Sequence, residues 1–185
     1  LNAIGINMLL GPVVDVLDNP DNPQGNLDIR VFGGDPEWVG ELGRAYIRGV
    51  HYGSNGEVAT VAKHFPGHGD SNRATDAEIA LTGKTFEELQ EVDLIPFIRV
   101  TEFDENDLAG ISDGFMSSHI AINDTGTEPV SLYYDSVAQE GGIEKLINQV
   151  DTLSTWHENG FIVVDSLGVG ALRNHYGITY DPVDI

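Results

Sequence analysis

Apolar runs along the chain alternate with longer stretches in which apolar residues recur every three or four positions. The runs are short and bounded by polar or turn-forming sequence, which is typical of strands, and they lie at 6–16, 57–62, 108–122 and 161–164. The longer stretches predict helices at 37–53, 85–102 and 142–153. The last run, Phe-Ile-Val-Val, is continuously apolar and predicts a strand covered on both faces.

Boundary residues support two of these helices. Asp35 and Pro36 are an N-cap and a first helical residue, and apolar residues follow at helical spacing: Trp38, Leu42, Ala45, Tyr46 and Val50. Thr85 and Glu88 form a capping-box pattern at the start of the second helix, in which Pro96 predicts a kink. Its inward residues are Leu89, Val92, Leu94, Phe97 and Ile98.

The repeated order of strand, loop and helix predicts an α/β fold with a parallel sheet. Polar residues follow the strands at Asp15, at 63–70, at His119 and at Asp165. In a (β/α)8 TIM-type barrel such positions meet on one face, where active sites are built. A doubly wound open sheet is the alternative, but no Gly-rich phosphate loop follows an early strand. We therefore expect a barrel and, because the chain starts inside an apolar run, a fragment of one.

The composition is that of a folded and strongly acidic domain. With 185 residues, of which 41% are hydrophobic, the chain is long enough to bury one core. A net charge of −21 argues against nucleic acid or an anionic membrane as the main partner, and no apolar run reaches membrane-spanning length. The absence of Cys excludes disulfides and thiolate metal sites. An acidic, Lys-poor surface fits secretion, the periplasm or the cytoplasm of a salt-adapted bacterium, and composition does not choose among them.

The octet KHFPGHGD at 63–70 gathers hydrogen-bond donors at the end of a strand. Lys63 and His64 can donate to ligand oxygens, while Gly67 and Gly69 allow a ligand to approach the backbone. This pattern indicates a binding surface for a polyhydroxylated or anionic ligand. In the alternative interpretation, the histidines only hold a Pro-Gly turn.

A metal site is disfavoured in the octet. His64 and His68 are four residues apart, a spacing that brings two ligands together on a helix. Pro66 and Gly67 break any helix there, and no third ligand follows at a motif-like spacing. We therefore predict no metal.

Two further strand-end residues each have two interpretations. Asp165 follows four apolar residues, where an unpaired carboxylate is costly to bury, so it is either a hydrogen-bonded structural acid or a nucleophile. His119 follows Phe-Met-Ser-Ser and is either a hydrogen-bonded core residue or part of a site.

Four blocks of sequence resemble, in the right order, the N-terminal (β/α)8 domain of glycoside hydrolase family 3, in its branch of bacterial β-N-acetylhexosaminidases. They are GPVVDV with DNPDNPQGNLDIRVFGGDPEWVGELGRAYIRG, then AKHFPGHGDSNRATDAEIAL, then ELQEVDLIPF with GFMSSHIAI, then GFIVVDSLGVGALRNHYG. The octet is the most specific part, since no general requirement of a loop would produce it. The resemblance implies that 1–185 is one partial domain, with barrel sequence missing before Leu1 and after Ile185.

The resemblance implies a retaining exo-glycosidase that hydrolyses terminal β-linked N-acetylglucosamine through a covalent glycosyl-enzyme. By position, Asp165 is similar to the catalytic nucleophile. Residues that hydrogen-bond the sugar or line its pocket match Arg30, Lys63, His64 and His119. Asp15 is expected to orient these donors. No cofactor is needed, and the expected partner is a carbohydrate such as an N-acetylglucosamine oligosaccharide or a peptidoglycan fragment.

The chain departs from this branch at one place. Relatives carry an Asp-Ser-His triplet after the octet, with the His as general acid/base and the Asp holding it, whereas this chain has Asp76-Ala77-Glu78. Glu78 could act as the acid if burial or Asp76 raised its pKa. Two alternatives stay open: the acid comes from elsewhere, as in family 3 β-glucosidases, or the protein is a non-catalytic sugar-binding relative.

Overall fold

The computed structural model describes residues 1–17, 27, 30–69, 71–72, 78–137 and 140–177. Its centre is a four-stranded parallel sheet in the order β1-β2-β4-β8, with the bounds Met8–Leu9, Ala59–Phe65, Gly114–Ser117 and Phe161–Val164. Beside it, β3 runs parallel to β5 and β6 antiparallel to β7, with the bounds Ala80–Leu81, Ile120–Ala121, Tyr134–Asp135 and Glu140–Gly141. The parallel central sheet confirms the predicted α/β fold.

The helices that connect the strands are α1 (Pro36–Ser54), α2 (Phe86–Glu91), α3 (Ile95–Arg99), α4 (Gly142–Asn148), α5 (Asp151–His157) and α6 (Gly170–Tyr176). Within the described residues, 3₁₀ turns lie at Asn2–Ile4, Leu108–Gly110 and Asn123–Thr125. Among the described residues, no helix has the length and apolar character needed to cross a membrane.

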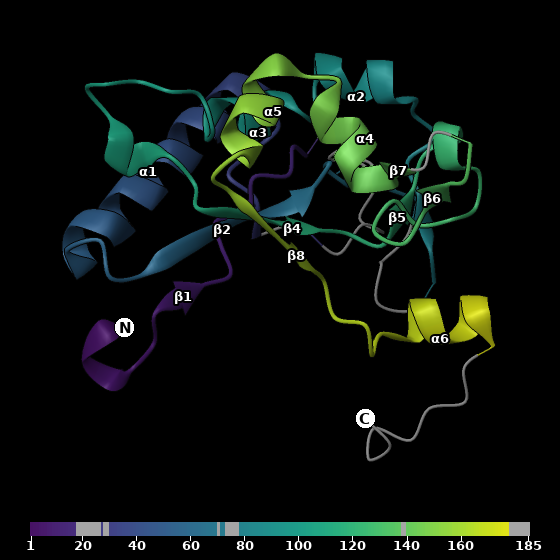
Figure 1. Cartoon of the computed structure of the whole chain (residues 1–185), viewed down its shortest axis with the longest axis horizontal. Helices are drawn as coiled ribbons and strands as arrows, with labels where there is room; N and C mark the ends of the chain where they lie inside the picture. Colours follow the sequence, from purple (N-terminus) through teal and green to yellow (C-terminus); the bar gives the residue numbers. More distant parts are fainter. Residues whose placement is uncertain (18–26, 28–29, 70, 73–77, 138–139, 178–185) are drawn as a thin grey trace.

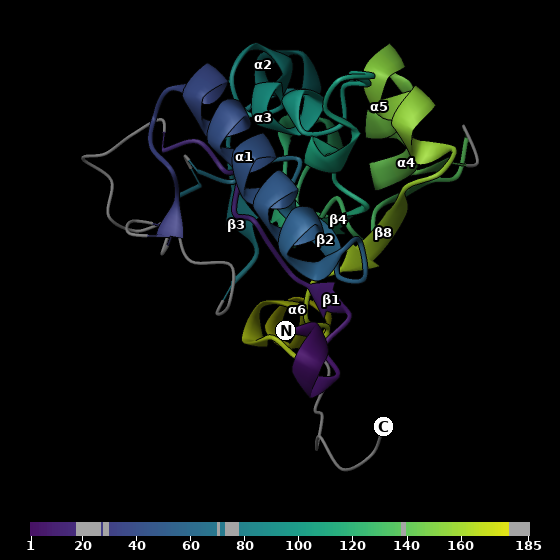
Figure 2. The same ribbon diagram turned by 90° about the vertical axis from the view of Figure 1, so that its left-hand side faces the viewer.

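The helices cover the central sheet mainly from one side. In both views α1 to α5 lie on this side, whereas α6 lies beyond the other (Figures 1 and 2). The strand order follows the chain without the reversal that defines the switch point of a doubly wound sheet. The expectation that β8 is covered on both faces is wrong for the described residues, since its strand positions are only partly buried and Val164 remains 41% exposed.

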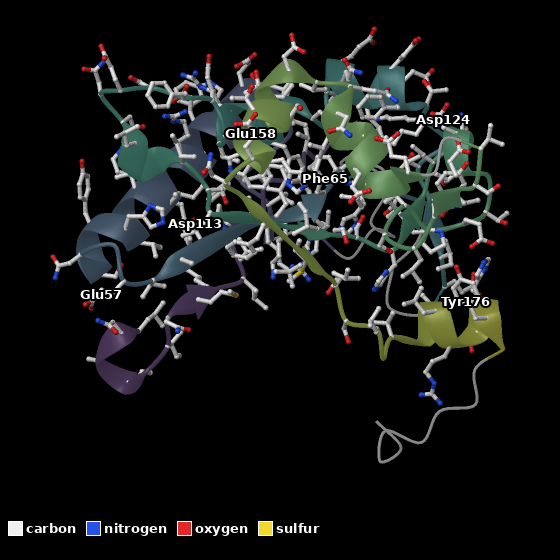
Figure 3. The ribbon with its side chains drawn as sticks, viewed as in Figure 1. Glu57, Phe65, Asp113, Asp124, Glu158 and Tyr176 are labelled. Atoms are coloured by element: carbon white, nitrogen blue, oxygen red, sulfur yellow. The ribbon has the colours of Figure 1, made fainter. Side chains whose placement is uncertain are left out.

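Four aromatic rings form the centre of the core between the sheet and the helices. Phe65 of β2 and Phe115 of β4 stack with centroids 5.2 Å apart, and Phe97 of α3 meets both rings edge-on at 5.3 Å. Trp156 of α5 stacks on Phe115 at 4.1 Å. Phe65 lies beneath the helices near the middle of the molecule (Figure 3). Since Phe65 is fixed in this cluster, the position of its neighbours in the octet is fixed as well.

The sequence correctly places α1, β2 and β8. The Asp35 side chain accepts a hydrogen bond from Trp38 N at 3.1 Å, and Pro36 is the first residue of α1. β8 has the predicted bounds. β2 begins inside the predicted strand and continues into the octet as far as Phe65.

Other predicted elements are interrupted. The helix predicted at 85–102 is two helices, α2 with the predicted capping box and α3, because Pro96 cannot donate to the carbonyl of Val92 and its ring would clash with it. The helix predicted at 142–153 is likewise divided into α4 and α5. The strand predicted at 6–16 is reduced to β1, since Pro12 has no N–H to donate to a ladder. The run at 108–122 forms a 3₁₀ turn, β4 and β5.

The face that α1 buries is not the one marked by its largest apolar residues. Trp38, Leu42 and Tyr46 are 66%, 41% and 41% exposed, and the buried residues are Val39, Gly40, Gly43, Arg44, Ile47 and Ser54. A Cβ atom on Gly40 would lie 2.7 Å from Arg99 Cβ of α3. The glycines therefore let α1 pack closely on its neighbours, an advantage that an apolar pattern does not reveal.

Candidate active site

The residues that the sequence assigns to a site follow the ends of β2, β4 and β8. Phe65 pairs with Ser117 and Ser117 with Val164, so these three strands end at the same level. Beyond the ladder, Ser118 N donates to Phe65 O at 2.9 Å, and Asp165 N donates to Ser117 O at 3.0 Å. The backbone therefore brings the octet and Asp165 to the carboxyl edge of the sheet, where parallel α/β folds place their ligands.

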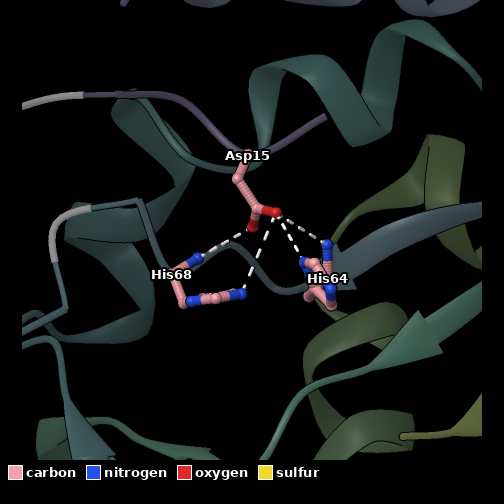
Figure 4. A group of neighbouring side chains, drawn as sticks. All are labelled: Asp15, His64 and His68. Carbon is pink, nitrogen blue, oxygen red and sulfur yellow. Dashed lines mark hydrogen bonds and ion pairs between the residues drawn. The ribbon is translucent and has the colours of Figure 1, made fainter. Parts of the chain in front are cut away.

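Asp15 is a fully buried carboxylate that holds the octet through three N–H groups (Figure 4). Its Oδ2 accepts from His64 N at 3.1 Å and lies 2.7 Å from His64 Nδ1, while Oδ1 accepts from His68 N at 3.0 Å. An ionised carboxylate only accepts hydrogen bonds, so His64 Nδ1 carries a proton in this contact. Asp15 thus fixes both the backbone of the octet and the tautomer of His64.

The glycines of the octet serve the packing of the loop on its own chain. Gly67 has φ +109°, and a Cβ atom there would lie 2.8 Å from Asp93 Cβ. A Cβ atom on Gly69 would lie 1.6 Å from the carbonyl oxygen of Val16. Our interpretation that these glycines make room for a ligand is therefore wrong, because the space is filled by protein.

His64 and His68 converge although no helix brings them together. Their ring centroids are 4.6 Å apart, and with Asp15 they form a group whose possible ligand atoms lie within 4.8 Å of one another. Pro66 and Gly67 do break the helix, but the premise that only a helix would bring the two histidines together is wrong, because a turn does so and Asp15 provides a third group. Two ligands of a tetrahedral zinc ion lie about 3.3 Å apart at ordinary bond lengths. At 2.7 Å, His64 Nδ1 and Asp15 Oδ2 instead share a proton.

The buried groups of this network have shifted pKa values. Burial alone would raise the pKa of Asp15, but attraction by His68 and His64 and the hydrogen bonds from both lower it to about 2. Burial lowers the pKa of His68 to about 4, and the attraction of Asp15 offsets this only in part. Neither ring nitrogen of His68 has a hydrogen-bond partner among the described residues, so a charged ring would be costly there. At neutral pH, Asp15 is ionised and His68 is neutral.

The pKa of His68 makes stability depend on pH. In the unfolded chain this imidazole takes up a proton below about pH 6.5, whereas in the folded protein, with a pKa of about 4, it stays neutral. Protonation of His68 below pH 6.5 therefore favours the unfolded chain. The free energy of unfolding should fall by about 2 kcal/mol between pH 7 and pH 5 from this group alone. Urea unfolding at both pH values should show this loss, and His68→Gln should remove it. If His68→Gln lost as much stability between pH 7 and pH 5 as the parent protein, the loss could not be assigned to His68. His157→Gln, at the end of α5, serves as the control.

Arg30 contacts the octet through His64. Arg30 Nη2 lies 3.3 Å from His64 Nε2, and a guanidinium only donates hydrogen bonds, so Nε2 is the acceptor. This agrees with a proton held on Nδ1 by Asp15. Our expectation that His64 donates to a ligand changes accordingly, because Asp15 and Arg30 engage both ring nitrogens: a sugar hydroxyl would donate to Nε2 only by taking the place of Arg30.

Lys63 is half-buried among charged groups at the same edge. Burial lowers the pKa of its ammonium group and the charge of Arg30 lowers it further, whereas Asp165 and Asp15 raise it. Two cations and two carboxylates thus lie within electrostatic reach of one another. Such a set offers both donors and acceptors to the hydroxyl groups of a sugar.

Asp165 is half-buried at the mouth of the site. Its Oδ1 accepts from Ser166 N at 2.8 Å, and Oδ2 makes no hydrogen bond within the part of the chain that the structure describes. The carboxylate is therefore held in place through Oδ1, while Oδ2 can contact a ligand.

His119 supports the backbone behind Asp165. Its Nε2 lies 3.2 Å and 3.1 Å from the carbonyl oxygens of Asp165 and Ser166, and its Nδ1 lies 2.7 Å from Ser131 Oγ. Because carbonyl oxygens only accept, Nε2 carries the proton and Nδ1 accepts from the Ser131 hydroxyl. Both nitrogens of this buried ring are engaged, which favours the interpretation of His119 as a hydrogen-bonded residue that positions Asp165. Ser131 was missed because nothing in its local sequence marks it.

The structure describes one residue of the expected acid/base pair, Asp76 and Glu78. Asp76 lies outside the described residues, and Glu78 is exposed. Ala80 of β3 pairs with Ile120 of β5, so Glu78 comes to the level of the strand-end residues just before Ile120. Glu78 also lines a cavity of about 340 Å³ together with residues of α6.

A larger cavity, of about 610 Å³, lies at the opposite edge of the sheet, between α1 and α5. In its wall His51 Nε2 lies 2.9 Å from Asp113 Oδ2, which also accepts from Thr60 N at 2.7 Å. These contacts tie α1 to the amino ends of β2 and β4. The polar side chains that the sequence singles out are at the other edge, where we therefore place the site.

Comparison with known proteins identifies the family. The model of the glycosyl hydrolase family 3 N-terminal domain matches residues 1–183. The chain is 38% identical over 102 residues to a β-hexosaminidase of Hydrogenovibrio crunogenus, which covers 55% of this chain and 27% of that protein. It is 32% identical over 132 residues to a β-hexosaminidase of Pseudomonas aeruginosa, which covers 71% of this chain and 36% of that protein.

Solved structures agree with this result. A glycoside hydrolase family 3 β-N-acetylglucosaminidase from a Paenibacillus species matches with a TM-score of 0.71 and 28% identity, over 96% of this chain and 30% of that one. The chain thus spans about a third of the length of these proteins. With a match along nearly its whole length, it belongs to glycoside hydrolase family 3, as a member of the family's N-terminal domain.

Proposed function

We propose that this chain is the part of a retaining exo-glycosidase that binds the terminal sugar, β-linked N-acetylglucosamine, and carries the nucleophile. The observation that carries the proposal is the meeting of Asp165 with Lys63, His64 and Arg30 at one edge of the sheet. The choice of N-acetylglucosamine is supported by relatives named β-hexosaminidase and β-N-acetylglucosaminidase.

In the first step, Asp165 Oδ2 attacks the anomeric carbon and the bond from that carbon to the leaving oxygen breaks. Glu78 gives its proton to the leaving oxygen, so that the aglycone departs as an alcohol. Lys63 and Arg30 donate hydrogen bonds to sugar hydroxyls, and one hydroxyl takes the place of Arg30 as the donor to His64 Nε2, which orients the ring over Asp165.

In the second step, water attacks the same carbon on the opposite side from Asp165, and Glu78 takes up the proton of that water. The ester bond to Asp165 breaks and the sugar leaves with its original β configuration. Side-chain carboxyl groups and water supply all the chemistry, so the proposal requires no cofactor.

We also propose that 1–185 forms part of a (β/α)8 barrel domain. Parallel strands in chain order, helices gathered on one side of the sheet and polar residues at the carboxyl ends support this arrangement.

Glu78→Gln tests the role of the acid. Turnover of an N-acetylglucosaminide with a poor leaving group should fall by roughly 10²- to 10⁴-fold, because the alkoxide would have to leave without a proton. An activated aryl N-acetylglucosaminide should lose less than about fivefold in its first step, since a nitrophenolate leaves unaided. Pre-steady-state release of the phenol measures that step.

Glu87→Gln is the matched control, because Glu87 is an exposed carboxylate of α2 away from the strand ends. Equal losses on both leaving groups, or none, would contradict the role of Glu78. In the second case the acid lies elsewhere, and faster turnover of an aryl β-glucoside would favour a β-glucosidase. No turnover of either sugar would favour a non-catalytic sugar-binding protein.

A further inference from the structure

His68 is a buried imidazole whose ring nitrogens the fold leaves unpaired. It is 3% exposed, and neither nitrogen has a hydrogen-bond partner in the part of the chain that the structure describes. Buried polar atoms are nearly always paired with protein, water or an ion, so an unpaired ring calls for an explanation. His68 Nε2 lies 3.9 Å from Asp15 Oδ2, and Figure 4 shows it directed at this carboxylate. The two groups are too far apart for a hydrogen bond but close enough to share a small ligand.

Asp15, His64 and His68 each offer a possible ligand atom at the same point. These three atoms lie within 4.8 Å of one another, and all three side chains are buried. Asp15 Oδ2 lies 2.7 Å from His64 Nδ1 and 3.9 Å from His68 Nε2. Two ligands of a tetrahedral ion lie about 3.3 Å apart at ordinary bond lengths, so a change of about 0.6 Å in each separation would fit both pairs to one ion.

Two imidazoles and one carboxylate are a donor set for divalent transition metals. Zn²⁺ is bound by such sets, whereas Mg²⁺ and Ca²⁺ prefer oxygen ligands alone. The ionised Asp15 carboxylate also accepts from His64 N and His68 N, and hydrogen bonds of this kind orient the ligands of a metal. Asp15 and Asp165 attract a positive charge at His68, and Arg30 repels it. The surroundings therefore contain more carboxylate than guanidinium charge.

We propose that Asp15, His64 and His68 form a latent site for a divalent transition metal such as Zn²⁺, which takes the place of the proton between Asp15 and His64 and prevents sugar binding. The proton leaves Nδ1 and Nε2 takes one up from solvent, so the ring stays neutral. Nε2 then donates, and its contact with Arg30 Nη2 is lost because a guanidinium also only donates. The charge of the ion also repels Lys63 and Arg30. The ion is thus an inhibitor and not a cofactor, and this consequence rests on the proposed function.

Calorimetric titration of the untagged protein with ZnCl₂ tests the site. The parent should bind one Zn²⁺ tightly, and an excess of Mg²⁺ should not displace it. His68→Gln should weaken this binding by more than about 100-fold, because losing a ligand costs more than the roughly 10- to 100-fold of losing an outer partner. His157→Gln is the matched control, since His157 also has a buried nitrogen without a described partner, and it should bind Zn²⁺ as the parent does.

Co²⁺ provides a measurement on the parent alone, which decides the matter if His68→Gln fails to fold. Tetrahedral Co²⁺ absorbs visible light far more strongly than six-coordinate Co²⁺, because it lacks a centre of symmetry. The parent should give a strong band that Zn²⁺ abolishes. A weak band, or equal Zn²⁺ affinity in the parent and a folded His68→Gln, would overturn the site, because exposed carboxylates would then hold the ions.

The inhibition is measured separately, as the affinity for N-acetylglucosamine with and without saturating Zn²⁺. We expect a loss of about tenfold or more, the effect of one or two lost hydrogen bonds, and EDTA should reverse it. An unchanged affinity would overturn the inhibition. If the parent binds no N-acetylglucosamine without metal, the proposed function fails, and the Zn²⁺ titration still decides on the metal site.

Discussion

Asp165→Asn is expected to lower the turnover of an aryl β-N-acetylglucosaminide by roughly 10⁴-fold or more while leaving the fold intact. The amide cannot attack the anomeric carbon, and it removes the negative charge that stabilises the positive charge developing there. Its carbonyl oxygen can still accept from Ser166 N, which is the one hydrogen bond that the Asp165 side chain makes in the described structure. Steady-state rates and urea unfolding curves of both proteins measure the two effects.

The control is Asp151→Asn, which removes the same charge from an exposed position in the first turn of α5. It should change turnover less than about twofold, because a screened surface charge far from the reaction has little effect on it. A loss of less than tenfold in Asp165→Asn would mean that another group attacks the sugar. A large loss of stability would mean that Asp165 is the structural acid of our alternative interpretation.

Asp15→Ala is expected to lower the free energy of unfolding by about 4 kcal/mol, even though Asp15 does not react with the substrate. Asp15 is fully buried and accepts hydrogen bonds from His64 N, His64 Nδ1 and His68 N, so the variant leaves three donors unpaired in the core. Urea unfolding at pH 7 measures the loss. Sugar binding should weaken as well, because the tautomer of His64 is no longer fixed.

Asp35→Ala is the matched control, since Asp35 accepts one hydrogen bond at the exposed start of α1. Losing such a cap costs about 1 kcal/mol. If Asp15→Ala cost no more than this control, Asp15 would not hold the octet, and the assignment of the His64 tautomer to Asp15 would lose its basis.

The sequence predicts elements best where one local rule decides them. A capping pair begins α1, and a short apolar run stopped by Asp165 defines β8, so both are placed correctly. Where the rules conflict, tertiary contacts decide. Apolar spacing predicts one helix over 85–102, but Pro96 removes a donor within it and the chain forms two helices.

The candidate site is predictable as a collection of residues but not as a network. The octet and Asp165 both follow parallel strands, and this position is enough to predict that they lie close together. The bond between Asp15 and the octet joins residues 49 positions apart, and no spacing rule in one sequence reveals such a pair. The glycines were misinterpreted for the same reason, because the groups that they approach, Val16 and Asp93, are distant in sequence.

Trapping the glycosyl-enzyme tests the central claim most directly. The protein is incubated with a fluorinated N-acetylglucosaminyl fluoride that forms the covalent intermediate faster than water removes it, and the digest is sequenced by mass spectrometry. We expect one sugar residue attached to Asp165 and no label in Asp165→Asn. A label on another residue, or hydrolysis by the protein without any covalent adduct, would contradict the assignment of Asp165 as the nucleophile of a retaining glycosidase.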